Sequence, residues 1–75
     1  MPPIFQVGDR VIVEFGVGSP QHGQVVAVSD HHQTITVRLS EGIMGQGDMP
    51  LQWNSENNYE LLAGGNVKVL KLAMN

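Results

Sequence analysis

Apolar and polar residues alternate with a period of two along much of this chain, and that alternation limits what it can fold into. The clearest case is residues 34–40, where Ile35, Val37 and Leu39 are separated by polar residues. Successive side chains of a β-strand point to opposite faces, so this pattern predicts an antiparallel strand with one buried face. No stretch shows the spacing of an amphipathic helix of useful length. We therefore predict an all-β fold.

Four other segments carry the same pattern and are expected to form the remaining strands: residues 9–15, 23–30, 57–63 and 67–73. Turn-forming residues separate them. A loop of about eight residues is expected at Gly16–Gly23, and a tight turn at Gly64–Asn66. A short hairpin connection is expected at Ser29–Gln33, in which Asp30 starts the turn.

The last segment has two candidate faces, because Val67 and Val69 share one phase whereas Leu70 and Leu72 share the other. A bulge or a single helical turn near Val69 or Leu70 would reconcile them. The predicted core takes one of these pairs together with Val11, Val13, Phe15, Val26, Val28, Ile35, Val37, Leu39 and Leu61. The apolar residues outside the pattern line either the second face of a curved sheet or an interface between copies. They are Ile12, Val25, Leu62, Ile43 and Met44.

Residues 41–57 break the alternation, with three glycines and one proline. Either they hide a short strand at Leu51–Trp53, or they form a long loop whose Trp53 folds back onto the barrel; we favour the loop. The chain is then one domain over residues 1–75, with an extended leader at residues 1–4. Its five strands bury their edges best by closing into a small antiparallel barrel.

Charge and composition limit the partners of the chain. Four Lys and Arg face seven Asp and Glu, for a net charge of −3. Nucleic-acid binding depends on cations that neutralise phosphates, so this balance argues against a nucleic-acid partner. There is no cysteine, no signal-peptide pattern and no apolar run of membrane-spanning length. We expect a cytoplasmic protein without a membrane partner.

Two short stretches, GDRV at Gly8–Val11 and GQVVAV at Gly23–Val28, follow the pattern GDxV and GxVxxV. Through these two stretches, residues 5–40 resemble the KOW motif. This resemblance implies a five-stranded SH3-like barrel, and RNA, a ribosome or a polymerase as the partner. The loop at Gly16–Gly23 departs from that motif, because it carries no Lys or Arg. From the residues themselves, Gly8 and Gly23 suit bends or close backbone approach, and Asp9 suits a bond to a turn N–H.

The GDRV opening is also similar to that of the plasmid-type (type II) dihydrofolate reductases, which are SH3-like barrels assembled as tetramers around a pore. This likeness implies an oligomeric reductase. Here Ile12, Val13 and Glu14 stand where that family carries lysines, and Leu51–Trp53 is a loose echo of its VQIY segment. The chain further resembles small SH3-like proteins of bacteria, phage and mobile elements, a likeness that implies a fold and no function.

His31 and His32, beside Asp30, form the one cluster of metal-capable side chains in the sequence. Adjacent side chains of an extended chain point apart, so we interpret these histidines as exposed turn residues. Ser29, Asp30 and His31 are contiguous, whereas a catalytic triad depends on spatial geometry. We expect no catalytic residue, no metal, no cofactor and no enzymatic activity.

Aromatic residues near acidic ones offer a candidate protein-binding face. The candidate residues are Trp53, Tyr59, Asp48, Glu56, Glu60 and Pro20, the last in a loop at Gly16–Gln21 that is expected to adjoin the others. The other interpretation is that Trp53 and Phe15 are simply the largest core residues. We expect a small non-enzymatic module that acts through self-association or a protein partner. A KOW-like nucleic-acid module and an oligomeric plasmid-type reductase are the alternatives.

Overall fold

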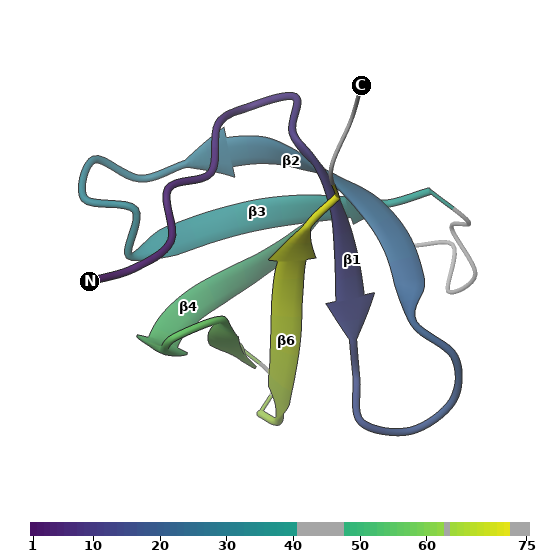
Figure 1. Cartoon of the computed structure of the whole chain (residues 1–75). Coiled ribbons are helices and arrows are strands. Elements are labelled where there is room, and N and C mark those ends of the chain that lie inside the picture. Colours follow the sequence, from purple (N-terminus) through teal and green to yellow (C-terminus); the bar gives the residue numbers. More distant parts are fainter. Residues whose placement is uncertain (41–47, 63, 73–75) are drawn as a thin grey trace.

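Six antiparallel strands form the fold, in a computed structural model that describes residues 1–40, 48–62 and 64–72. They are β1 (Arg10–Glu14), β2 (Gln21–Val28), β3 (Thr34–Leu39), β4 (Met49–Ser55), β5 (Asn58–Leu61) and β6 (Asn66–Lys71). Each strand pairs with the next, and β6 returns to pair with β1 (Figure 1). The predicted antiparallel barrel is confirmed, but with six strands in place of five. Within the described ranges there is no helix that could cross a membrane.

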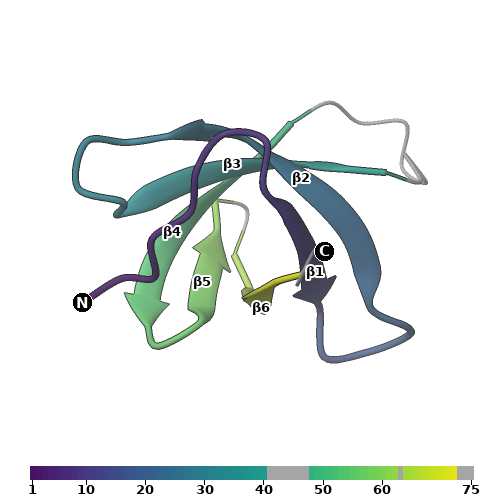
Figure 2. The ribbon, with the colours of Figure 1, turned by 45° about the horizontal axis from the view of Figure 1, so that its top comes forward.

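The sixth strand is β4, which lies inside the segment that we expected to be a loop. It pairs with β3 on one side and with β5 on the other (Figure 2). Met49, Leu51 and Trp53 share the inward phase of the strand, and Leu51 is fully buried. The long-loop prediction is therefore wrong for Met49–Ser55, and the alternative strand at Leu51–Trp53 was right but too short. Residues 41–47 lie outside the described part of the chain.

Pro50 is tolerated in β4 because of where its missing N–H would point. The backbone N–H of Trp53 donates to the carbonyl of Gln33 at 2.7 Å, so odd-numbered residues of this strand direct their N–H toward the β3 side. Pro50 has the opposite phase, and pairing with β5 starts only at Leu51. No ladder bond is lost at Pro50, as is typical of proline at the end of a strand.

The barrel core differs from the prediction mainly on β2. Val25 is fully buried, whereas Val26 is only half-buried, because the register to β3 shifts between Val25 and Ala27. This bulge inserts one residue, so that Val28 points toward the core although it is three residues after Val25. The inward side chains of β2 therefore do not follow a strict period of two. Among the described residues, the buried hydrophobic ones are Phe5, Val11, Val13, Val25, Ile35, Val37, Leu51, Tyr59, Val67 and Val69.

The last strand resolves the choice between its two faces. Val67 and Val69 are buried, and the pairing of β6 with β1 runs without a shift, including Ile12 opposite Leu70. The bulge or helical turn predicted near Val69 is therefore wrong. Leu70 lies on the outer face of the sheet beside Ile12, and each is half-buried there.

The other apolar residues left out of the predicted core fall in different places. Val25 is in the core, and Leu62 is 81% exposed. Phe15, which was predicted to be a core residue, packs against the core without being fully buried. Ile43 and Met44 lie outside the described residues. The exposed large apolar residues of the described chain lie in the leader, in the β1–β2 loop and after β5.

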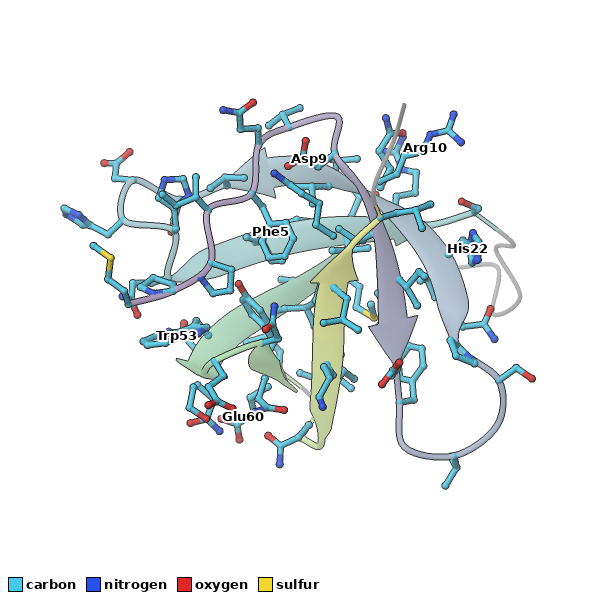
Figure 3. All side chains as sticks on the ribbon, in the orientation of Figure 1. Phe5, Asp9, Arg10, His22, Trp53 and Glu60 are labelled. Carbon is cyan, nitrogen blue, oxygen red and sulfur yellow. The ribbon has the colours of Figure 1, made fainter. Side chains whose placement is uncertain are left out.

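The segment before β1 is attached to the barrel by Phe5. The ring of Phe5 is buried and points toward the barrel (Figure 3). It lies 6.3 Å from the ring of Tyr59, at a tilt of 59°. Gly8, at φ +101°, donates its N–H to the carbonyl of Val25 at 2.8 Å. Asp9 accepts the N–H of Gln6 at 2.9 Å, which is the turn bond predicted for it. The segment before β1 therefore covers one end of the core and is held there by the Phe5 ring and these hydrogen bonds.

Candidate functional site

Trp53 occupies the end of β4 and is half-buried, so its indole ring packs on the core with part of its surface left to solvent. Its Nε1–H donates to the carbonyl of Glu56 at 2.9 Å. This bond satisfies the polar edge of the ring and restrains its orientation. Trp53 is therefore partly a core residue, as the second interpretation expected, and its role in protein binding stays a prediction.

The two-residue turn between β4 and β5 sets the position of that ring. The register between the two strands shifts between Trp53 and Ser55, and Glu56 follows with a left-handed φ of 50°. The side chain of Asn57 donates to the carbonyl of Val69 at 3.0 Å, and the N–H of Val69 donates to the carbonyl of Asn57 at 2.9 Å. The turn is therefore tied to β6, and through Glu56 it holds the indole.

Two exposed carboxylates belong to the same β4–β5 hairpin as the Trp53 ring. Glu56 is exposed in the turn, and Glu60 is exposed on β5 opposite Gln52, the residue before Trp53. In the described ranges neither glutamate takes part in an ion pair. We call Trp53, Glu56 and Glu60 the Trp53 surface. It combines an indole held by its Nε1–H bond with two solvent-exposed carboxylates of the same hairpin, of which Glu60 lies on the outer face of β5.

Tyr59, which the sequence placed on this face, lies in the core. It is the cross-strand partner of Trp53, but its side chain is fully buried, so it has no surface to offer a partner. Its hydroxyl has no hydrogen-bond partner among the described residues. Burial disfavours the phenolate and raises the pKa of Tyr59 to about 12.

Asp48 and Pro20 do not belong to the Trp53 surface. Asp48 precedes the opposite end of β4, roughly 16 Å along the strand from Trp53. It is already paired with Arg38, whose Nε lies 2.8 Å from its Oδ1, and this carboxylate raises the pKa of Arg38. Pro20 is exposed in the β1–β2 loop, which Figures 1 and 2 show well apart from the β4–β5 turn. The predicted adjacency of that loop to Trp53 is not found.

The histidine-bearing hairpin between β2 and β3 is held by Ser29 rather than by Asp30. The Ser29 hydroxyl accepts the N–H of Thr34 at 3.0 Å, and its carbonyl accepts the N–H of His32 at 3.1 Å. His32 takes a left-handed φ of 60°. Across the described residues, no three His, Asp or Glu side chains come together as metal ligands.

A second feature escaped the sequence analysis. A hollow of about 160 Å³ opens on the barrel, lined by Arg10, Val11, His22, Gly23, Gln24, Ser40 and Leu72. No motif in the sequence indicates it, because its residues come from four separate segments that only strand pairing brings together. One partial signal was present: Arg10 has the outward phase of its strand. We call this feature the Arg10 hollow.

Comparison with known proteins adds nothing to this geometry: no family model, no curated protein and no solved structure matches the chain.

Proposed function

We propose that this protein is a non-enzymatic binding module, with a barrel of the SH3-like kind, that receives a cationic segment of a partner protein on the Trp53 surface. The observation that carries the proposal is the bond from the indole Nε1–H of Trp53 to the Glu56 carbonyl, on a ring that is still partly exposed. A ring held in one orientation loses little side-chain entropy when a ligand binds to it.

The chemistry of the surface favours a cation. The face of an indole attracts a guanidinium or ammonium group, with about 0.5–1 kcal/mol at an exposed site. Glu56 is an exposed carboxylate of the turn that holds the ring and Glu60 is one on the outer face of β5, and each exposed ion pair adds about 0.2–1 kcal/mol. A segment with two or three Lys or Arg residues would engage the ring and both carboxylates together.

The closed sheet limits how a peptide can bind. All six strands have neighbours on both sides in the described barrel, so none offers its whole edge to an added strand. Recognition then depends on side chains rather than on main-chain pairing. Such contacts support weak, salt-sensitive binding, with a Kd of roughly 10 μM to 1 mM.

Trp53 is the single tryptophan of the chain, so its fluorescence reports directly on this surface. We expect a short Arg- and Lys-rich peptide to change Trp53 emission saturably, and added salt to weaken the effect. Glu56→Gln and Glu60→Gln should each weaken binding about two- to fivefold. Glu14→Gln, which removes the same charge from β1, is the matched control and should bind as the parent does.

Several outcomes would reject the proposal. One is an emission that the basic peptide leaves unchanged; another is an equal loss of binding in the Glu14→Gln control. An emission that depends on the protein concentration alone would indicate self-association through this surface instead. Binding of RNA with no response to the peptide would favour the KOW-like alternative.

A further inference from the structure

The Arg10 hollow lies on the outer face of the barrel, over the junction of β1 and β2. Its base is formed by Val11 and Gly23, which are paired across these strands and direct their own Cβ positions toward the core. A Cβ on Gly23 would come within 2.8 Å of the Val37 side chain, so glycine is needed there. The backbone under the hollow is therefore set by core packing.

Strand register brings polar side chains together around this base. Arg10 of β1 lies opposite Gln24 of β2, so both project outward from one row. His22 lies on the same outer face, two residues before Gln24. The N–H of Ser40 donates to the carbonyl of His22 at 2.8 Å, which holds the start of the segment after β3 against β2.

The walls of the hollow are also held by backbone and side-chain bonds. The carbonyl of Arg10 accepts the N–H of Leu72 at 2.8 Å, which places Leu72 at the β6 side. The amide of Gln24 donates to the carbonyl of Gly8 at 3.3 Å, and its second N–H is left for another acceptor. Among the described residues Arg10 makes no ion pair, unlike Arg38 and Lys71.

The polar groups of the hollow are rich in hydrogen-bond donors. Arg10 contributes five guanidinium N–H groups, and His22, Gln24 and Ser40 contribute an imidazole, an amide and a hydroxyl. Of the residues that the structure describes, no Asp or Glu lines the hollow. An arginine fork with several further donors is suited to an oxyanion, which it binds through short, charge-assisted bonds.

We propose that the Arg10 hollow binds one tetrahedral oxyanion of the phosphoryl class. Four donor side chains match the oxygens of a tetrahedral anion better than the two oxygens of a carboxylate. A volume of about 160 Å³ holds a single such group and is smaller than the pockets that take drug-sized ligands. This site is separate from the Trp53 surface, and Figure 3 shows Arg10 and His22 on the side of the barrel away from Trp53 and Glu60.

The test is a titration of the ¹⁵N-labelled chain with inorganic phosphate at constant pH and ionic strength, with chloride as the balancing anion. We expect saturable shifts of the Arg10, Gly23 and Gln24 amide signals, and smaller effects from acetate. Arg10→Gln should weaken phosphate binding about tenfold or more. Lys68→Gln removes the same charge from the outer face of β6 and should leave binding unchanged.

The proposal is overturned if phosphate produces no saturable shift, or if acetate binds as well as phosphate does. Equal weakening by Lys68→Gln would also overturn it, because it would mean general charge attraction only. His22→Gln is a second test of phosphate binding that does not depend on whether the Arg10 variant folds. It should weaken phosphate binding by about two- to tenfold. Because the titration does not involve Trp53, its failure leaves the proposed peptide binding untouched.

Discussion

The Trp53 surface and the Arg10 hollow use the same barrel in opposite ways. The Trp53 surface depends on irregular backbone: a register shift after Trp53, a left-handed Glu56 and an indole bond across the turn. The Arg10 hollow depends on regular pairing, in which Arg10 faces Gln24 across two strands. The first offers an aromatic ring with carboxylates, and the second a guanidinium with further donors.

This contrast indicates how a chain of 75 residues with a net charge of −3 can still present a cationic site. The net charge governs electrostatic attraction at long range, whereas the pairing register of the strands determines which charged side chains lie next to one another. An acidic turn and an arginine on the outer sheet face are compatible because the barrel core lies between them (Figure 3). Each surface can therefore be disturbed without the other.

The strongest disturbance should come from the core beneath the Arg10 hollow. We expect Gly23→Val to reduce the free energy of unfolding by about 1–3 kcal/mol, because its Cβ would meet Val37 at 2.8 Å and the Arg38 carbonyl at 3.1 Å. Urea denaturation measures this. Ala27→Val, on the exposed face of the same strand, is the control and should change stability little. Equal effects from both would contradict the close packing at Gly23.

A smaller loss should follow at the Trp53 surface. Asn57→Ala removes the side-chain bond to the Val69 carbonyl and should cost about 0.5–1.5 kcal/mol. Because Asn57 ties the turn to β6, we also expect Trp53 emission to shift toward that of an exposed indole. Asn58→Ala in the adjacent position serves as control. An unchanged emission in Asn57→Ala would show that the turn does not hold the ring.

A substitution in the core between the two surfaces should keep or raise the free energy of unfolding rather than lower it. Tyr59→Phe removes a buried hydroxyl that has no partner among the described residues, so stability should stay equal or rise by up to about 1 kcal/mol. The parent protein should also lose stability as the pH rises from 10.0 toward about 12, since Tyr59 ionises more readily when unfolded. The variant should lack this part of the alkaline loss. A clear destabilisation by Tyr59→Phe would mean that the hydroxyl is bonded.

The smallest effect is expected at Asp9, which joins the leader to the barrel. The Gln6 N–H lowers the pKa of Asp9 below 3.8, and the Lys71 ammonium, 3.3 Å from its Oδ2, adds to this. Its contribution to stability is therefore present above pH 3.8 and is lost as the pH falls through the lowered value. Thermal unfolding of Asp9→Asn should show a weaker acid dependence than that of the parent. Identical acid profiles for Asp9→Asn and the parent would contradict this.

Sequence reasoning succeeded where strands are regular and where the relevant residues are neighbours in the chain. It found β1 and β3 and the turn bond of Asp9, all within short segments, whereas the grouping of Trp53 with Glu56 and Glu60 as a binding face stays a prediction. It assigned the wrong buried residue on β2, Val26 in place of Val25, because the bulge after Val25 changes which side chains point inward from what a strict period of two predicts.

The other failures have physical causes of the same kind. Pro50 masked β4, since the strand pairs on one side only at that position and so tolerates a missing N–H. Tyr59 has a polar hydroxyl and acidic neighbours, which suggested the surface, but its inward phase on β5 buries it. The Arg10 hollow could not be predicted, because it depends on register between distant strands.

The separation of the two surfaces is the central claim, and one two-ligand titration tests it most directly. A ¹⁵N-labelled sample would be titrated first with a basic peptide and then with phosphate. We expect the peptide to shift amide signals between Gln52 and Glu60, and phosphate to shift those of Arg10, Gly23 and Gln24, with neither ligand displacing the other. Competition between the ligands, or a peptide that shifts the Arg10 signals, would contradict the claim.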